Sequence, residues 1–391
     1  MLELGIVGKP NTGKTTLFNA LTACNAPVAS YPFTTIEPNI GVTYVRAKCP
    51  CLEMGVKCNP QNSRCINGIR FVPVRVIDVA GLIEGAHRGR GLGNKFLDSL
   101  RMAAVLIHVV DASGSTDSEG RPCEAGTHDP AQDLEFLERE IDLWLQGIVG
   151  KEWERLERRM KSEKIDLVGE LAPRLSGLGI TKEHIAAALK EAGFDLPKFC
   201  AELRRISKPM VVAANKMDIP ASEKNLERLK KTGRTVIPIS AEAELVLRRA
   251  SERGLIAYTP GSGDFQVLKP ESLTEAQKAA LEGVRRVLKK CGSTGVQELV
   301  DKAIREVLGL IVVYPVDDEN RLTDKKGNVL PDAFLVPKGL TAREFAYKIH
   351  TELGETFLYA INARTKMRVA DDYQLQDGDI IKVVAAKGRA A

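Results

Sequence analysis

The first residues with a recognisable chemical pattern lie at positions 8–15, which read GKPNTGKT. A short apolar run precedes them, and an apolar helical pattern, LFNAL, follows. In the pattern G-x-x-x-x-G-K-T, the glycines let backbone N–H groups surround phosphate oxygens at a helix N-terminus. Lys14 can supply a positive charge to the β- and γ-phosphates, and the hydroxyl of Thr15 can bind magnesium. Residues 8–15 therefore predict a site for a nucleoside triphosphate.

A second chemical pattern, D-x-x-G, ends another apolar run at Asp78 to Gly81. An aspartate at this place can reach magnesium through water, and the backbone of Gly81 can approach the γ-phosphate. Residues 85–93 then contain four glycines, which favours a mobile switch over a rigid connection. A plain surface loop is the alternative interpretation of these glycines.

Two further patterns indicate which base is bound. Residues 215–218 read NKMD and residues 240–242 read SAE. The carboxylate of Asp218 can accept hydrogen bonds from N1 and the N2 amino group of guanine, and adenine lacks this pair of donors. The stem of Lys216 can lie along the base, and the backbone of residues 240–242 can donate to the guanine oxygen. These patterns predict GTP as the preferred nucleotide.

Five short apolar, β-rich runs must position these groups, at residues 4–7, 74–77, 105–110, 210–213 and 236–239. Such runs are typical of strands buried on both faces of a parallel sheet. Because helical patterns separate them, we expect a doubly wound α/β domain with its ligand at the carboxyl edge of the sheet.

The hydrophobic and charge patterns divide the rest of the chain into helical segments and a C-terminal module. Long charged amphipathic stretches predict a helical insertion over residues 129–207, and a further helical segment covers 243–307. Together these ranges give a P-loop domain at 1–307. Residues 308–391 alternate short strand patterns with one expected helix, from Thr341 to Leu353, which suits a compact α+β module.

The order of Gly8, Thr35, Asp78, Asn215 and Ser240 matches the five motifs of translation-factor-type GTPases. Within that class the chain resembles the Obg group, and most closely its YchF-related branch with a C-terminal TGS domain. The resemblance covers essentially the whole chain and is carried by YPFTT at 31–35, DVAGL at 78–82 and GRGLGNKFL at 89–97. It implies a regulatory GTPase, which converts GTP to GDP and phosphate, and a β-grasp, ubiquitin-like fold for residues 308–391.

The resemblance also implies roles for single residues. Thr35 would sense magnesium and the γ-phosphate, with Thr34 as the neighbouring alternative. Leu82 follows D-x-x-G and cannot orient water as glutamine does, so we expect slow intrinsic hydrolysis. Asn11 matches the asparagine with which similar GTPases hold potassium; its alternative interpretation is a turn residue that satisfies the local backbone. YchF proper has a weakened base-reading motif and prefers ATP, whereas NKMD is intact here.

The complete set of expected site residues follows from these motifs. Residues expected to act in hydrolysis are Asn11, Lys14, Thr35 and Gly81. Magnesium is expected at Thr15, Thr35 and Asp78. Residues expected to bind the nucleotide are Gly8, Lys9, Pro10, Asn11, Thr12, Gly13, Lys14, Thr15, Thr16, Asn215, Lys216, Met217, Asp218, Ser240, Ala241 and Glu242.

The TGS-like module resembles domains that contact RNA and the ribosome. Cations that could reach phosphates are Lys338, Lys348, Arg364, Lys366 and Arg368. Each one taken singly is equally consistent with a solvating surface charge. We expect a ribosome or RNA partner through this module.

Four of the eight cysteines crowd into one short segment, at Cys49, Cys51, Cys58 and Cys65. Four thiolates could hold zinc and fasten an insertion too small for its own core. The spacing is not a C-x-x-C pair, so zinc, free thiols and disulfides all stay open.

The whole composition limits the remaining function classes. The chain has 391 residues, 27% charged residues and a formal charge of +5, with no apolar run long enough to span a bilayer. With no secretion signal at the N-terminus, we expect a cytoplasmic monomer that binds no membrane. A nucleotide-dependent enzyme acting on a small-molecule substrate is the alternative function. It would need a second catalytic constellation, and we find none in the sequence.

Overall fold

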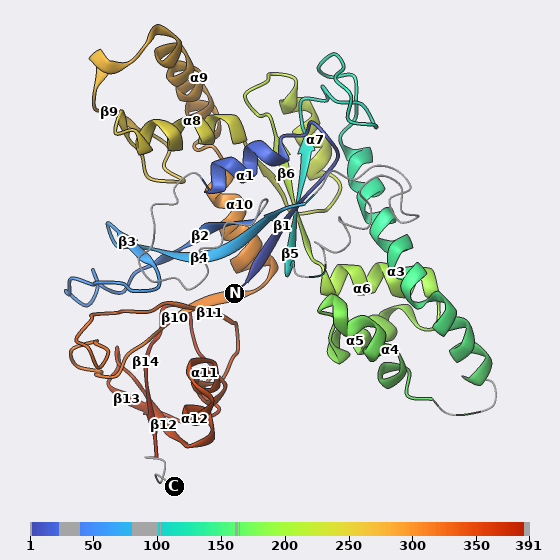
Figure 1. The fold of residues 1–391 in the computed structure, drawn as a ribbon, viewed down its shortest axis with the longest axis vertical. Coiled ribbons are helices and arrows are strands. Elements are labelled where there is room, and N and C mark those ends of the chain that lie inside the picture. Colours follow the sequence, from blue (N-terminus) through green and yellow to red (C-terminus); the bar gives the residue numbers. More distant parts are fainter. Residues whose placement is uncertain are drawn as a thin grey trace. The chain divides into compact units, whose positions relative to one another are not determined.

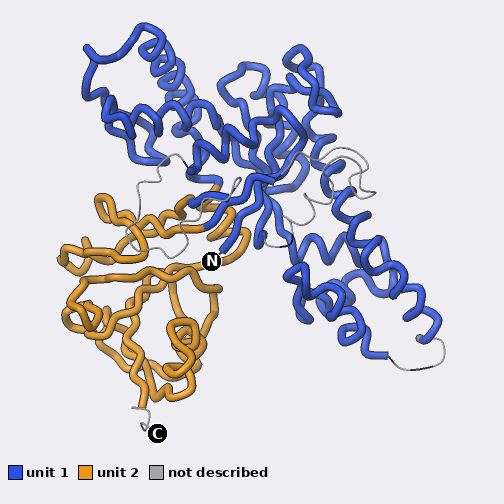
Figure 2. The backbone as a smooth tube through the Cα atoms, in the orientation of Figure 1, with its two compact units in different colours: residues 1–24, 36–42, 75–299 blue, residues 25–35, 43–74, 300–391 orange. Residues whose placement is uncertain are grey.

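The protein is described here by a computed structural model, which covers residues 2–22, 40–79, 101, 103–160, 163 and 165–386. The chain forms two compact units, distinguished by colour in Figure 2. The first unit comprises residues 1–24, 36–42 and 75–299, and the second comprises residues 25–35, 43–74 and 300–391. Residues 43–74, which fall inside the expected domain 1–307, thus belong to the same compact unit as the C-terminal residues.

The larger sheet has seven strands in the order β2-β4-β1-β5-β6-β7, with β3 paired to β4. Its strands are β1 (Glu3–Val7), β2 (Ile40–Lys48), β3 (Arg64–Ile66), β4 (Ile69–Asp78), β5 (Val105–Asp111), β6 (Met210–Asn215) and β7 (Val236–Pro238). Strand β1 is parallel to β4 and β5, and β5, β6 and β7 also pair in parallel. The predicted P-loop α/β fold is confirmed, and β3 adds an antiparallel strand.

Burial explains why the five apolar runs form strands. Every residue of β1 and of β5 is buried, as expected for parallel strands that are covered on both faces. Helices α1 (Lys14–Thr22) and α7 (Ser222–Lys230) follow β1 and β6 in the chain (Figure 1). Since parallel strands all end at one edge, this topology brings the P-loop, Asp78, Asp111 and Asn215 to the same edge of the sheet.

The range expected as a helical insertion contains four α-helices, drawn in green in Figure 1. They are α3 (Ala131–Met160), α4 (Leu167–Leu175), α5 (Lys182–Ala192) and α6 (Leu196–Ser207). Residues Leu137, Ile141, Leu145 and Val149 recur every four positions along α3 and are all buried, so they form one apolar stripe. Farther along α3, the Trp153 ring stacks on Phe194 with centroids 4.4 Å apart.

The helical segment after β7 contains three α-helices and a small hairpin. These elements are α8 (Ala241–Glu252), β8 (Ile256–Ala257), β9 (Gln266–Val267), α9 (Glu275–Cys291) and α10 (Val296–Lys302). Helix α9 begins with a reciprocal capping box between Thr274 and Gln277 and ends at Gly292, which has a φ of 78°. These are the start and stop signals that the sequence carries at the two ends of this helix.

The C-terminal module is a five-stranded sheet in the order β11-β10-β14-β12-β13. Its elements are β10 (Leu310–Pro315), β11 (Phe334–Pro337), α11 (Ala342–Ile349), α12 (Thr351–Glu355), β12 (Phe357–Asn362), β13 (Met367–Val369) and β14 (Ile380–Ala385). The fully buried ring of Phe345 on α11 packs into the apolar core between helix and sheet. This arrangement confirms the β-grasp-like fold.

The single helix expected from Thr341 to Leu353 is wrong in one respect, because the structure breaks it at His350. His350 has an extended backbone (φ −161°, ψ 138°), and its Nδ1 accepts a hydrogen bond from the N–H of Glu352 at the start of α12. The break therefore provides a local cap for α12. Within the described residues, no helix is both long enough and apolar enough to cross a bilayer.

Candidate functional site

The P-loop between β1 and α1 needs glycine at both ends of its motif. Gly8 has a φ of 145° and Gly13 a φ of 96°, which side chains rarely adopt. A Cβ atom on Gly13 would lie 2.2 Å from Asn215 Nδ2, and one on Gly8 would lie 2.5 Å from the carbonyl oxygen of Val109. The loop therefore packs directly against β5 and the end of β6, and both glycines are sterically required.

Lys14 and Thr15, the first two residues of α1, hold the polar groups expected near the phosphates. Lys14 Nζ donates to the carbonyl oxygen of Lys9 at 2.8 Å, and Thr15 Oγ1 donates to Asp78 Oδ2 at 3.0 Å. A hydroxyl and a carboxylate side by side are the oxygen donors that magnesium prefers, so Thr15 and Asp78 fit this ion. Thr35, Gly81 and Leu82, the other residues expected around the γ-phosphate, lie outside the described residues.

Burial shifts the pKa values of Lys14 and Asp78. Burial lowers the pKa of the Lys14 ammonium, and the carboxylate of Asp78 opposes that shift. Burial also raises the pKa of Asp78, against the hydrogen bond from Thr15 and the charge of Lys14. Each charged form is thus destabilised by desolvation. A phosphate beside Lys14 and a cation beside Asp78 would stabilise the charged forms.

The side chain of Asn215 joins two of the predicted motifs. Its Nδ2 donates to the carbonyl oxygen of Thr12 at 2.9 Å, and its Oδ1 accepts from the N–H of Ala241 at 3.0 Å. Close by, Ser240 Oγ donates to Asp218 Oδ1 at 2.8 Å. The structure therefore brings residues 12, 215, 218 and 240–241 together, and the Asp218 side chain is exposed to solvent.

Lys216 is anchored by an acid that the sequence analysis missed. Its Nζ lies 2.9 Å from Asp111 Oδ2 and 3.2 Å from Ser115 Oγ. Asp111 ends β5 and also accepts hydrogen bonds from Ser113 and Thr116. Burial alone would raise the pKa of Asp111, but the hydrogen bonds from Ser113 and Lys216 outweigh burial and lower it. The aspartate at the end of an apolar run, before the residues ASGST, was the available signal.

Lys9 is also held by an acid from a distant element. Its Nζ lies 2.8 Å from Asp133 Oδ2 on α3 and donates to the carbonyl oxygen of Thr116 at 3.0 Å. His128 Nε2 lies 2.8 Å from the other oxygen of Asp133. Both members of the Lys9–Asp133 pair are buried. The ammonium of Lys9 is thus committed to α3, and a contribution of Lys9 to nucleotide binding would come from its backbone.

Asn11 contacts the loop that follows β5. Its Nδ2 donates to the carbonyl oxygen of Gly120 at 2.8 Å. Gly120 has a φ of 79°, and a Cβ atom there would lie 2.8 Å from the carbonyl oxygen of Pro10. This contact uses the amide nitrogen of Asn11, and Oδ1 accepts no hydrogen bond from any residue that the structure describes. Oδ1 is the atom that would bind a cation.

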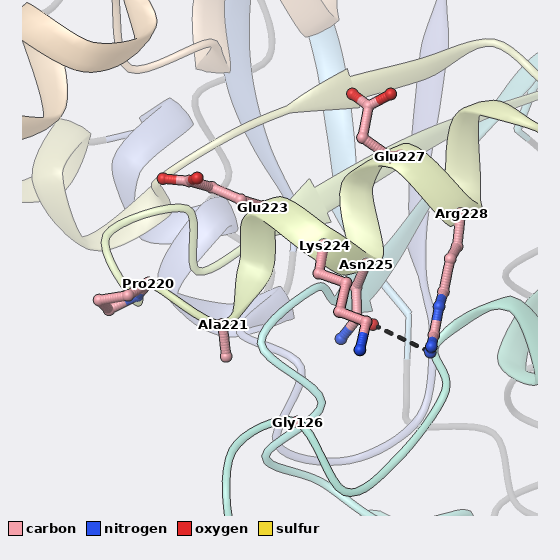
Figure 3. Close-up of a pocket in the computed structure, with 8 residues that line it drawn as sticks. All are labelled: Gly126, Pro220, Ala221, Glu223, Lys224, Asn225, Glu227 and Arg228. Carbon is pink, nitrogen blue, oxygen red and sulfur yellow. Dashed lines mark hydrogen bonds between the residues drawn. The ribbon is translucent and has the colours of Figure 1, made fainter.

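Two surface clefts lie near these motifs. One is lined by residues of the loops expected to contact the base and of α8 and α9, namely Met217, Asp218, Pro220, Ser240, Glu242, Ala243, Val246, Ala280, Gly283, Val284, Arg286, Val287 and Lys290. The sequence analysis did not connect α9 with the base. The second cleft, shown in Figure 3, lies between α7 and the turn at Gly126. None of the expected nucleotide-binding residues lines this second cleft, and its Asn225 and Arg228 side chains bond to each other.

The four clustered cysteines converge in space. Their sulfur atoms all lie within 4.8 Å of one another, with 3.9 Å between Cys49 and Cys58 and 3.8 Å between Cys51 and Cys65. A disulfide would need a separation of about 2 Å. Tetrahedral zinc with Zn–S bonds of about 2.3 Å places its sulfurs roughly 3.8 Å apart. The cluster therefore fits a zinc ion.

Comparison with protein families gives matches along most of the chain. Residues 3–148 match the family described as 50S ribosome-binding GTPase. Residues 213–318 match the family described as Obg-like GTPase YGR210-like, G4 motif-containing domain. Residues 322–385 match the TGS domain.

Individual proteins resemble the chain over its full length. An uncharacterized GTP-binding protein of Methanocaldococcus jannaschii is 53% identical over 396 residues, which cover 99% of this chain and 100% of the relative. The ribosome-binding ATPase YchF of Bacillus subtilis is 26% identical over 417 residues, 97% of this chain and 98% of that protein. A crystal structure of a GTP binding protein from Pyrococcus horikoshii OT3 superposes with a TM-score of 0.78 at 43% identity, covering 98% and 100% of the two chains.

The buried pair of Lys9 and Asp133 leads to a stability prediction. Replacing Asp133 with Asn keeps an acceptor for hydrogen bonds but leaves the ammonium of Lys9 buried without a counter-charge. We expect the free energy of unfolding to fall by about 3–5 kcal/mol. Urea denaturation of the nucleotide-free protein measures this change. The matched control is Glu135→Gln on an exposed position of the same helix, which should shift it by less than about 0.5 kcal/mol. Equal stability of the two variants would contradict the prediction.

Proposed function

This chain belongs to the family of Obg-like, YchF-related GTPases with a C-terminal TGS domain, and on that premise we propose that it hydrolyses GTP to GDP and phosphate. The observation that carries the proposal is the junction at Asn215, which ties the P-loop to the 240–242 turn. This junction holds the exposed carboxylate of Asp218 beside Ser240. The Bacillus subtilis relative is named a ribosome-binding ATPase, so the first question to test is whether this chain prefers guanine or adenine nucleotides.

Guanine selectivity follows from the chemistry of Asp218. A carboxylate accepts two hydrogen bonds, and guanine offers N1–H and an N2 amino group as donors on one edge. Adenine has no such donor pair and would leave the carboxylate desolvated without partners. The cleft beside Asp218, lined by apolar Val246, Val284 and Ala280, offers a surface for the purine ring. We propose that α9 thereby forms part of the base site.

The proposed hydrolysis uses residues at the carboxyl edge of the sheet. Lys14 would leave the carbonyl oxygen of Lys9 and bind the β- and γ-phosphates. Thr15 and Asp78 would hold magnesium together with Thr35, and the bound ion would neutralise charge on the phosphate oxygens. The backbone of Gly81 would contact the γ-phosphate and respond to its loss. Asn11 Oδ1 would bind potassium. Four thiolates at Cys49, Cys51, Cys58 and Cys65 would hold zinc in a structural role.

We further propose that the nucleotide state controls binding to the ribosome or to RNA through the TGS domain. Lys338, Lys348, Lys366 and Arg368 are exposed, whereas Arg364 is half-buried and donates to the carbonyl oxygen of Gly378. The four exposed cations can therefore meet phosphates, although Lys366 also donates to the carbonyl oxygen of Glu319 and Arg368 lies over the Tyr359 ring. The relative YchF of Bacillus subtilis is named a ribosome-binding ATPase, which supports this choice of partner.

The first functional prediction tests the base. Asp218→Asn should weaken GTP and GDP binding together by about 100-fold or more, because each hydrogen bond to a charged group contributes about 1.5–3 kcal/mol. The asparagine should also favour xanthine nucleotides, whose C2 carbonyl accepts a hydrogen bond where guanine donates one. Calorimetric titration with GTP, GDP, ATP and XTP measures these affinities, with Asp264→Asn as an exposed control in the same unit. ATP binding as tight as GTP binding to the unmodified protein would overturn guanine selectivity.

The second prediction concerns potassium. We expect GTP hydrolysis to be faster in potassium than in sodium at equal ionic strength, and Asn11→Ala to remove most of that difference with little change in nucleotide affinity. A cation near the β/γ bridging oxygen stabilises charge that develops in the transition state. Single-turnover rates at saturating GTP measure the effect.

The matched variant for this experiment is Asn11→Asp, which retains an oxygen but loses the N–H donor to Gly120. A potassium response that persists in Asn11→Asp assigns the effect to the oxygen ligand rather than to the contact with Gly120. Equal rates in both salts, or a full potassium response in Asn11→Ala, would contradict the proposed site.

The third prediction tests the partner. Sucrose-gradient sedimentation with ribosomes should show binding that differs between a GTP analogue, GDP and no nucleotide. Replacing Lys366 and Arg368 together with Ala should weaken that binding, and raising the salt concentration should weaken it further, as for phosphate contacts. The control pair is Lys325→Ala with Lys326→Ala, two exposed lysines of the same domain. Equal co-sedimentation with ribosomes in all three nucleotide states would contradict the proposed switch.

A further inference from the structure

The segment that carries the four cysteines, residues 49–66 and here called the cysteine loop, has little apolar core of its own. Its largest apolar side chains point outward, with Leu52 70% and Ile66 42% exposed. Cys49 and Cys51 are buried, and Cys58 and Cys65 are half-buried. A segment of this size usually needs a metal or a disulfide to hold its shape. The convergence of the four sulfurs therefore marks the centre around which the loop is organised.

Within the second unit, the cysteine loop forms several hydrogen bonds to one segment of the C-terminal domain, residues 328–333, and its Glu53 also pairs with Arg364. The N–H of Asn59 donates to the carbonyl oxygen of Val329 at 3.1 Å, and that of Gln61 donates to the carbonyl oxygen of Pro331 at 2.7 Å. The side chain of Asn62 exchanges two hydrogen bonds with the backbone of Ala333, at 3.0 and 3.1 Å. These bonds all lie between Cys58 and Cys65 in the sequence, so the cysteine cluster fixes both ends of the bonding stretch.

Arg70, on β4, connects the cluster to the same segment. Its Nη2 lies 3.4 Å from Cys49 Sγ and donates to the carbonyl oxygen of Leu330 at 3.0 Å. Its Nη1 donates to Ser63 Oγ at 3.0 Å, and its guanidinium lies over the Tyr314 ring, 5.3 Å from the centroid. Arg70 is 0% exposed. The Arg70 side chain thus contacts one sulfur of the cluster and two residues of the C-terminal domain, Leu330 and Tyr314.

The charge of Arg70 indicates the state of the cluster. A guanidinium removed from water needs an anion nearby. Arg70 interacts electrostatically with the carboxylate of Asp332 but forms no ion pair with a carboxylate in the described part of the chain. Zinc with four deprotonated thiols carries a net charge of −2, because the ligands lose their protons on binding. Four neutral thiols would supply no charge. The contact between Arg70 and Cys49 is therefore best satisfied when the cysteines hold a divalent metal.

We infer that zinc at the four cysteines is the joint that fixes residues 328–333 of the TGS domain to the cysteine loop, with Arg70 as the connecting side chain. This inference rests on the zinc binding proposed above and is independent of nucleotide hydrolysis. Loss of the metal would release the loop, and the hydrogen bonds of residues 59–62 to residues 329–333 would open with it. Hydrogen bonds inside the C-terminal sheet would persist, since β10 pairs with β11 and β14.

Hydrogen exchange on the full-length protein, followed by mass spectrometry, tests the joint. The protein as purified should contain about one zinc per chain, as a four-thiolate structural site requires. After zinc is removed with a chelator and magnesium is restored, amides of residues 328–333 should exchange about tenfold faster or more. Amides of residues 310–314, in β10, serve as the internal control and should keep their rates.

Two variants separate the metal from the connection. Cys58→Ser should lose zinc and reproduce the effect of the chelator, whereas Cys291→Ser, at an exposed cysteine outside the cluster, should change neither quantity. Arg70→Met should retain zinc and still accelerate exchange at residues 328–333. GTP hydrolysis is measured on the same samples. An absence of hydrolysis would contradict the GTPase proposal without affecting the test of the joint.

The outcomes are distinct. If the purified protein contains no zinc and its hydrogen exchange does not change with chelator, both the metal site and the joint are overturned. Protein that contains zinc but keeps slow exchange at 328–333 after its removal overturns the joint and leaves the zinc site standing. Faster exchange confined to residues 49–66 also overturns the joint, because the C-terminal segment would then be held without it.

Discussion

The nucleotide site depends on one amide side chain, that of Asn215. Its two hydrogen bonds hold the backbone of the P-loop at Thr12 and the backbone of the 240–242 turn at Ala241. The same side chain occupies the space where a Cβ atom of Gly13 would otherwise lie. The loops proposed to bind the phosphates and to recognise the base therefore share a contact, and neither loop can shift without disturbing the other. An asparagine suits this place because one amide group both donates and accepts.

Charge pairing around this contact distinguishes the three lysines of the site. Lys9 is neutralised by Asp133 from the inserted helix, and Lys216 is neutralised by Asp111 from β5. Lys14 bonds to a carbonyl oxygen, and no carboxylate of the described residues forms an ion pair with it. Burial penalises an ammonium that lacks an anionic partner. Lys14, which interacts with the carboxylate of Asp78 without forming an ion pair, is thus the lysine whose position in the motif predicts a phosphate contact.

The second unit also contains a buried cation, but here the neighbouring group is a cysteine sulfur in place of a carboxylate. Arg70 is fully buried beside Cys49, and within the described residues it forms no ion pair with a carboxylate. Where carboxylates neutralise the buried lysines of the first unit, a thiolate cluster is suited to neutralise this arginine. In both units a buried cation ties together segments that are far apart in the sequence, because its hydrogen bonds reach groups on several of them.

The sequence by itself determined the motifs whose requirements are local. Glycines at fixed spacing and apolar runs buried on both faces are properties of neighbouring residues, so the parallel sheet, the P-loop and a compact C-terminal α+β module could be predicted. The β-grasp fold of that module was expected from the family resemblance. The partners of Lys9, Lys216 and Arg70 could not, because Asp133, Asp111 and Leu330 are brought to them only by the fold. The break at His350 was also missed, since a helical pattern continues through it and the reason for the break is the local cap of the next helix. Tertiary structure alone decided which charges are buried together, because pairing across long sequence separations leaves no periodic signal in the chain.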